Sequence, residues 1–518
     1  MAKVGFAKWI IVVTVILAAL LELIDSTVVN VSLTQIMGNL GGTLSDVAWV
    51  VTAYAVANVI ILPMTGWLSA RFGRKNYFAF SIILFTVASF LCGNSSNIWE
   101  LVIFRFIQGI GGGALLSTSQ SILFETFSVA ERGMATAIFG VGVVLGPTLG
   151  PTLGGWITDN YSWPWIFYVN IPLGIIAAAL TFTYIKDSAH HIRPPKTDWP
   201  GIGLLVTGIG ALQIVLERGE AEDWFETPYI VILSALSILS IITFIWWELN
   251  IEHPVVNLRV LTSNRQLAFG MVFTFILGFG LYASLFIFPI FVQGLLGWTA
   301  EQTGLLLMPS GLVSIIVMPT VGVLLRKGVP PQYLATIGFI MFFIFTHVLS
   351  NSTMASGWND FMWPQILRGI GMGFMFVPIT NFALSGLTAK DMQQGTGLNN
   401  MMRQLGGSFG IAAVATFINS RAAYHRNILL SNINIYDTET QQRLAAYTHG
   451  FIAQGFDPGR AQMMAAKAID GAVIRQSMLL SYMDNFWIVG VFFLLCIPLL
   501  LMQKKAAPLT KLTGAEGH

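Results

Sequence analysis

The sequence contains little charge, since Asp, Glu, Lys and Arg together make up 10% of its 518 residues, whereas 55% are hydrophobic. The mean hydropathy is +0.71. An ordinary soluble domain carries about 25% charged residues. The scarcity of charge therefore excludes an ordinary soluble protein and indicates a polytopic, all-α membrane protein.

Cysteine and histidine are scarce as well. The two cysteines, Cys92 and Cys496, both lie in apolar segments, so neither a disulfide framework nor a thiolate metal site is supported. The seven histidines are scattered, without a cluster at metal-ligand spacing. We therefore expect no metal and no enzymatic activity, and an integral membrane enzyme is the less favoured alternative. The basic residues form short separate clusters, which gives no reason to expect nucleic acid as a partner.

Long apolar runs give fourteen candidate spans, which start near residues 9, 47, 76, 98, 134, 165, 201, 228, 267, 303, 332, 361, 395 and 484. An even number places both termini on one side. Lys and Arg concentrate in the short loops on that side, so the positive-inside rule predicts cytoplasmic termini. The polar segment 420–483, which has a helical pattern, is predicted to be an extracytoplasmic loop.

The first span contains two carboxylates, Glu22 and Asp25, whose spacing places them on one helix face. An ionised Asp near the centre of a membrane helix costs about 2.5 to 3.5 kcal/mol, so these groups must face a protein or water-lined interior, or hold a proton. Arg105 in the fourth span lies about 10 Å deep and Asp25 about 9 Å deep. The matching depths allow an ion pair, and a gate that separates it would couple proton binding to conformation. A pair of polar groups that only joins neighbouring helices is the structural alternative.

Two further intramembrane arginines, Arg368 and Arg403, have no obvious acidic partner in the sequence, and we expect a structural role for them. Arg368 also belongs to an internal repeat. The fourth span contains Arg105 followed by three alternate glycines from Gly109, and the twelfth span contains Arg368 followed by three alternate glycines from Gly369. The end of the second span, Pro63 to Leu68, is echoed by Pro319 to Leu324. These echoes suggest two similar six-span halves with spans seven and eight inserted between them.

Two glycine-rich segments are candidates for gating. The turn after the second span combines glycines, which allow close helix approach, with basic residues that can hold helix carbonyls. A plain positive-inside anchor is the alternative interpretation of this turn. The fifth span carries glycines and prolines at near-helical spacing, which predicts a tightly packed, kinked helix that acts as a hinge or seal, with plain helix packing as the alternative. The candidate gating residues are Gly66, Arg71, Gly73, Arg74, Gly146, Gly150, Pro151, Gly154 and Gly155.

Several of these motifs together resemble a known family. The segments are 22–31, the turn 66–75, 105–109, 150–155 and 165–174. They are similar to those of the fourteen-span drug:proton antiporters of the major facilitator superfamily, and 216–225 together with the loop before the last span resembles its EmrB branch. One departure is Ala70, where the superfamily's turn usually has an acid. The resemblance implies a major facilitator fold, with Asp25 as the proton-titrating acid and Arg105 as its partner.

The resemblance also implies a function. We expect export of hydrophobic or amphipathic drugs and toxicants across a bacterial inner membrane, driven by the proton gradient without a cofactor. An EmrA-like periplasmic adaptor and an outer-membrane channel are the expected partners. A proton-coupled exporter of a native metabolite, siderophore or lipid would use the same motifs. Apolar residues in the helix that Asp457 and Pro458 would begin could dock an adaptor or pack on the transporter's own outer face.

The expected division is an N-terminal six-helix half (1–190), a linker with two added helices (191–260) and a C-terminal half (261–518) that includes the loop 420–483. A transport cavity should have apolar and aromatic walls with a few polar groups. The candidate lining residues are Tyr54, Asn58, Gln108, Tyr282, Phe286, Phe374, Phe376 and Asn381.

Overall fold

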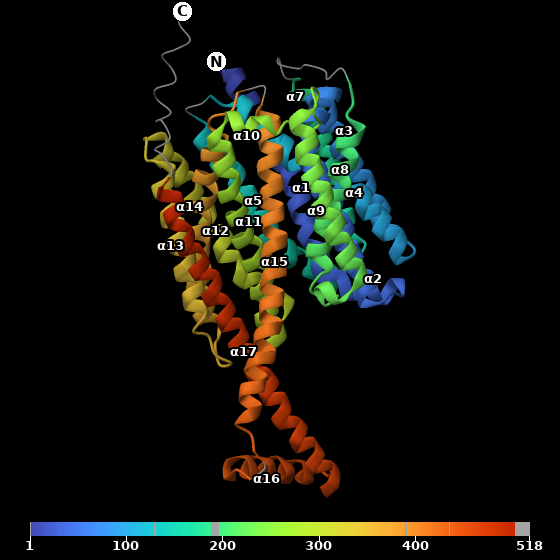
Figure 1. Cartoon of the computed structure of the whole chain (residues 1–518), viewed down its shortest axis with the longest axis vertical. Helices are drawn as coiled ribbons and strands as arrows, with labels where there is room; N and C mark the ends of the chain where they lie inside the picture. Colours follow the sequence, from blue (N-terminus) through green and yellow to red (C-terminus); the bar gives the residue numbers. More distant parts are fainter. Residues whose placement is uncertain (1, 129–130, 188–195, 389–390, 435, 503–518) are drawn as a thin grey trace, which may run out of the picture.

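The computed structural model describes residues 2–128, 131–187, 196–388, 391–434 and 436–502, and no strand occurs among them. Most of the helices run side by side as a bundle (Figure 1). The first half consists of α1 (Ala2–Leu40), α2 (Leu44–Phe72), α3 (Arg74–Gly93), α4 (Ile98–Thr126), α5 (Arg132–Asn160), α6 (Trp165–Tyr168) and α7 (Asn170–Tyr184). The expected boundary at 190/191 lies outside the described residues.

Two helices, α8 (Trp199–Arg218) and α9 (Pro228–Asn250), pack on each other and follow the first half, joined by the short 3-10 helix η2 (Trp224–Glu226). The remaining helices are α10 (Arg259–Ser263), α11 (Arg265–Ile290) with its terminal π-helical turn η3 (Phe291–Leu295), α12 (Ala300–Arg326), α13 (Pro331–Leu349), α14 (Trp358–Leu384), α15 (Met392–Ser431), α16 (Thr438–Ala453) and α17 (Pro458–Leu501).

Local sequence sets many of the helix starts. Thr43 caps α2 and Thr299 caps α12, and both form a capping box with the third residue of the helix. Asp457 accepts hydrogen bonds from the first turn of α17, and Pro458 occupies its first position. The predicted start of a helix at Asp457 and Pro458 is therefore confirmed.

Thirteen helices of the described residues are long and apolar enough to cross a membrane. The span expected to start near residue 395 corresponds to α15, which runs beside α11 and α17 but has a low mean hydropathy. The reason is its buried polar side chains, among them Asn399, Asn400 and Arg403, which are 0–3% exposed. A helix surrounded by protein rather than lipid can retain such residues, because other helices supply their hydrogen bonds.

The segment 420–483 is not a separate loop domain. With 40 and 44 residues, α15 and α17 are about 60 and 66 Å long, about twice the hydrocarbon thickness. The end of α15 and the start of α17 project together beyond the bundle, on the side away from α10, and α16 lies across them (Figure 1). We call the part from Ser420 to Met483 the arm. At its base Asp484 pairs with Arg421 and His425, at 2.6 and 2.8 Å.

The internal repeat in the sequence corresponds to a repeat in packing. In α4, Gly109 and Gly113 let the helix approach α2, and Gly111 lets it approach α3. In α14, Gly369 and Gly373 face α12, and Gly371 faces α13. Each glycine stripe thus packs one helix against the equivalent pair of neighbours in its own half.

The two halves meet along two equivalent seams, α5 against α12 and α2 against α15. The repeated motif lies in both. A Cβ on Gly66 of α2 would lie 2.6 Å from Gln394 of α15, and one on Gly322 of α12 would lie 2.9 Å from the carbonyl oxygen of Gly133 in α5. Gln394 also donates to the carbonyl oxygen of Pro63 at 3.1 Å. The glycines therefore allow backbone contact between the halves.

Candidate functional site

Asp25 lies at the centre of a fully buried hydrogen-bond network in the first half. Its Oδ2 accepts from Arg105 Nη1 at 2.5 Å, and its Oδ1 accepts from Gln108 Nε2 and Asn170 Nδ2, both at 2.8 Å. Asp25, Arg105, Gln108 and Asn170 are 0–1% exposed. The ion pair that the matching depths predicted is present, and α1, α4 and α7 each contribute to it.

Asn170 is a member of the network that sequence reasoning did not single out. It begins α7, within a segment whose mean hydropathy is 1.8. An amide side chain in so apolar a helix needs a buried partner. That polarity was the available signal, but it could not identify Asp25 as the partner because the two residues are 145 positions apart.

The guanidinium of Arg105 is held by more than its carboxylate. It donates to Gln108 Oε1 at 2.7 Å and to the carbonyl oxygen of Val50 at 3.3 Å. The ring of Tyr54 covers it, with its centroid 4.1 Å from the guanidinium carbon. Such a cation needs several partners because burial removes its hydration.

Glu22 has a different environment. It is 5% exposed, accepts from Asn58 Nδ2 at 3.1 Å through one oxygen, and its other oxygen has no hydrogen-bond partner among the described residues. It interacts electrostatically with Arg403 of α15 and with Asp25. Arg403, for which the sequence offered no obvious acidic partner, is thus close enough to Glu22 for their charges to interact.

The turn between α2 and α3 is fastened to its own half. Gly73 has a φ of 86°, which favours glycine, and a Cβ there would lie 3.2 Å from Asp187. Lys75 donates through its backbone to Asp187 at 2.9 Å and through Nζ to the carbonyl oxygen of Phe182 at 2.7 Å. Arg74 pairs with Glu125 of α4, and Arg71 is exposed. Asp187 and Glu125 thus supply the acids that Ala70 does not.

The glycines of α5 form its contact with α1. A Cβ on Gly146 would lie 2.6 Å from Leu23, one on Gly150 would overlap Thr27, and one on Gly154 would lie 2.7 Å from Val31. Pro151 and Gly155 are half-buried on the same helix. α5 remains one continuous helix through both prolines, and its other faces meet α12 and α14 of the second half. The segment that carries Asp25 therefore packs on the helix that forms the seam.

The candidate lining residues do not form one group. Gln108 belongs to the Asp25 network, Tyr54 covers Arg105, and Asn58 holds Glu22. Tyr282 interacts with Arg403. The remaining four lie in the second half, where Phe376 packs on Gly140 of α5, Phe286 and Phe374 are partly buried against the core, and Asn381 donates to the carbonyl oxygen of Val377 within its own helix.

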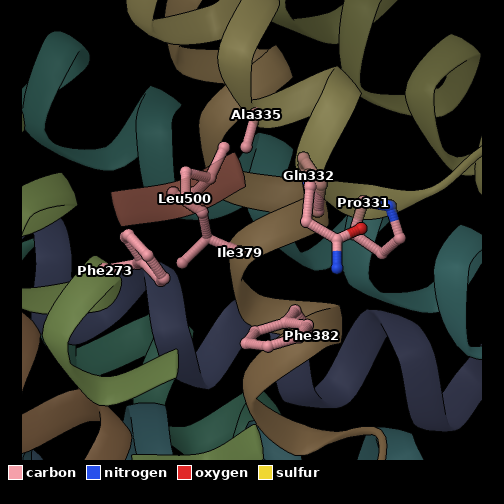
Figure 2. A pocket seen from close by; sticks show the side chains of 8 residues that line it. Phe273, Pro331, Gln332, Ala335, Ile379, Phe382 and Leu500 are labelled. Atoms are coloured by element: carbon pink, nitrogen blue, oxygen red, sulfur yellow. The ribbon is translucent and has the colours of Figure 1, made fainter. Parts of the chain in front are cut away.

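Figure 2 shows an apolar crevice between α11, α13, α14 and α17, into which Phe273, Ile379, Phe382 and Leu500 point. Its volume is about 10 Å³, enough for about one water molecule. This crevice is too small for a drug-sized molecule, and none of the candidate lining residues contributes to it.

Comparison with known proteins agrees with this architecture. The Major Facilitator Superfamily model matches residues 15–411. The chain belongs to the major facilitator superfamily. It is 34% identical over 498 residues to the multidrug export protein EmrB of Escherichia coli K12, covering 96% of this chain and 95% of that protein. It is 32% identical to the fatty acid resistance protein FarB of Neisseria gonorrhoeae, covering 97% and 96%.

Solved major facilitator structures share the fold. The human organic anion transporter MFSD10 has a TM-score of 0.60 at 13% identity, over 95% of this chain and 99% of that one. The proton:xylose symporter XylE has a TM-score of 0.56 at 14% identity, over 98% and 99%. This member of the superfamily is a multi-pass membrane protein with the fold of transporters, and its EmrB-like ancestry, expected from the motifs, is confirmed.

Proposed function

We propose that this protein exports lipophilic and amphipathic small molecules in exchange for protons, and that Asp25 carries the proton. The observation that carries the proposal is the buried network around Asp25, in which a single carboxylate receives one charged donor and two neutral donors. The energy source is the proton gradient, without a cofactor, and the protein is a transporter rather than an enzyme. Relatives named for multidrug export and for fatty acid resistance support this substrate class.

The geometry supplies a coupling mechanism. A proton on Asp25 removes the negative charge that compensates Arg105, and a buried uncompensated cation is costly. A movement of Arg105 towards other acceptors then lowers the free energy of this cation. At the same time, Gln108 and Asn170 donate to a neutral acceptor instead of a charged one. Because Asp25 lies on α1, and α1 packs on the seam helix α5, this rearrangement acts directly on the contact between the halves. In transport by alternating access, protonation of Asp25 would thereby shift the equilibrium between the inward-open and the outward-open state.

Glu22 has the secondary role. It faces Arg403 across the halves and retains an unpartnered oxygen, so its charge can respond to substrate or to Asp25. Both carboxylates lie in α1, three residues apart, at the level where α1, α2 and α15 face one another.

The cellular setting follows from the same proposal. The protein would lie in a bacterial inner membrane with cytoplasmic termini, so that the arm extends into the periplasm. Exposed apolar side chains on the arm, such as Tyr436 and Met463, at 86% and 58%, support docking of an EmrA-like adaptor that leads to an outer-membrane channel. The alternative, packing on the transporter itself, describes Val473 and Leu479 of the same helix, which are 7% and 6% exposed, whereas Met463 is left free for a partner.

The test is ethidium transport in proteoliposomes with an imposed pH gradient. Asp25→Asn keeps the shape of the side chain but removes the titrating group, so we expect gradient-driven transport to be abolished while the protein remains folded. Asp159→Asn, on an exposed residue of α5, is the matched control and should transport normally. Gradient-driven transport that persists in Asp25→Asn would contradict the proposed proton site.

A further inference from the structure

Two buried carboxylates meet where the pair of inserted helices begins and ends. Asp198 directly precedes α8 and Glu248 lies in the last turn of α9, and they are 4% and 0% exposed. Both carboxylates converge on Gly201 of α8. A Cβ on Gly201 would overlap Asp198 Oδ2 and would lie 2.8 Å from Glu248 Oε1. The glycine therefore leaves the space in which these two oxygens are neighbours.

Asp198 has the environment of an ionised carboxylate. It caps α8, where its Oδ1 accepts from the backbone N–H of Gly201 at 3.0 Å. The indole Nε1 of Trp247 donates to the same carboxylate, at 3.0 Å from Oδ1 and 3.2 Å from Oδ2. Two donors and the positive end of a helix dipole stabilise a negative charge at this position. If the two carboxyls carry one charge between them, it therefore lies on Asp198.

Glu248 has the environment of a neutral carboxyl. Its Oε2 accepts from the backbone N–H of Val256 at 3.4 Å, which is a long hydrogen bond. Its Oε1, the oxygen near Asp198, is buried and has no hydrogen-bond partner among the described residues. A buried carboxylate would need several donors to replace its hydration. Glu248 lacks the donors that would stabilise a negative charge.

The charged groups that interact with Glu248 are Asp198 at the start of α8 and, more weakly, Arg259 of α10. Arg259 is exposed, and its guanidinium donates to two backbone carbonyl oxygens, at 3.0 and 2.7 Å. Asp198 repels a negative charge on Glu248, because two like charges in a buried site cannot both be ionised without a large cost. A proton on Glu248 Oε1 removes this repulsion and gives the oxygen a partner in Asp198 Oδ2.

A metal cation fits this site less well than a proton does. A hard cation takes about six oxygen ligands. The described residues contain no group of three or more His, Cys, Asp and Glu side chains that could hold a metal ion. A proton needs only the two carboxylate oxygens that converge at Gly201.

We propose that Asp198 and Glu248 share one proton, which Glu248 holds and donates to Asp198. This second proton-binding site has no residue in common with the Asp25 network, and neither of its carboxyls takes part in the proposed transport mechanism. Through Val256 it also joins α9 to the segment that leads into α10 and the second half. Loss of the proton would place two like charges at this junction and weaken the attachment of the inserted helices.

Infrared spectroscopy of the purified full chain tests the proposal, because a protonated carboxyl has a carbonyl stretching band that a carboxylate lacks. At neutral pH we expect Glu248→Gln to lose one such band. Asp198→Asn keeps Glu248 but replaces its charged acceptor by a neutral one, so the band should shift. Glu252→Gln, the matched control, removes an exposed acid of the segment after α9 and should leave the band unchanged.

Thermal unfolding at a series of pH values is the second measurement. Above about pH 4.3, where an unfolded Glu loses its proton, the folded chain would bind one proton more than the unfolded chain, so this site should lower stability as the pH rises. Glu248→Gln keeps a neutral donor beside Asp198 and should lack this part of the decrease. Glu252→Gln should show the same decrease as the unchanged chain.

A protonated-carboxyl band that persists in Glu248→Gln would overturn the proposal, and so would an equal loss in Glu252→Gln. A band at the same position in Asp198→Asn and in the unchanged chain would show that Glu248 does not donate to Asp198, and would also overturn it. An unfolding profile of Glu248→Gln with the full pH dependence of the unchanged chain would do the same. Since neither measurement uses a gradient or a substrate, failure of proton coupling through Asp25 would leave these results unaffected.

Discussion

The two halves of the molecule use the same scaffold around an arginine, but among the residues that the structure describes only the first half pairs this arginine with an acid. Arg105 in α4 and Arg368 in α14 are both buried and both precede a glycine stripe. Arg105 pairs with Asp25, whereas Arg368 has a 3.4 Å contact with Gln365 and an Nε without a partner among the described residues. The helix α11, which packs on α15 as α1 packs on α5, contains no Asp or Glu. The repeat therefore preserves packing, while the buried acid of the proposed proton site lies in the first half.

The largest effect should separate the two arginines. Arg105→Met leaves Asp25 buried without its counter-charge, which should cost about 3 to 5 kcal/mol of stability. Arg368→Met removes a buried cation that has no acidic partner among the described residues, so its cost should be below about 1.5 kcal/mol, as for a volume-conserving apolar replacement. Thermal unfolding of both variants in the same detergent measures the difference. Equal destabilisation would mean that the halves do not differ in the way proposed.

A smaller effect is expected at Asn170, which donates to Asp25 Oδ1 at 2.8 Å. Asn170→Ala removes one hydrogen bond to a charged group, worth about 1.5 to 3 kcal/mol. The same unfolding assay applies, with Asn160→Ala as the control because Asn160 is exposed and bonds within its own helix. A stability equal to that of the control variant would show that the hydrogen bond from Asn170 does not stabilise the Asp25 network.

The smallest effect should come from Glu22, where the network reaches across to the second half. Glu22→Gln keeps a group that can accept from Asn58 but removes the charge that faces Arg403. We expect gradient-driven ethidium transport to fall by less than about tenfold, which corresponds to about 1.4 kcal/mol. Complete loss, equal to that of Asp25→Asn, would show that both carboxylates titrate during transport and that their ranking here is wrong.

Much of the proton site could be predicted from residues alone. An acid and an arginine in apolar segments are rare enough to require partners, and counting from the helix ends gave Asp25 and Arg105 the same depth. The role of Asn170 and the electrostatic interaction between Glu22 and Arg403 could not be predicted in this way. Counting residues from a helix end gives the depth of a side chain in the membrane, but it does not show which other helix packs beside that side chain.

The arm and the inserted helices illustrate the same limit. The sequence indicated a polar, helical segment at 420–483 and two additional spans. It did not show that α15 and α17 continue unbroken beyond the bundle, nor that α8 and α9 bring Asp198 and Glu248 together.

The sequence by itself determined three things: that the chain lies in a membrane, at which residues its helices begin, and which ionisable groups are buried. It could do so because a bilayer imposes the same free-energy cost on a charge or an unpaired backbone group wherever that group occurs along the chain. Tertiary structure alone decided which of those groups compensate one another. Helices of similar hydropathy can be neighbours in many arrangements. Close packing at glycines such as Gly66, Gly150 and Gly369 selects the arrangement in which Asp25 pairs with Arg105, while Arg368 pairs with no acid in the part of the chain that the structure describes.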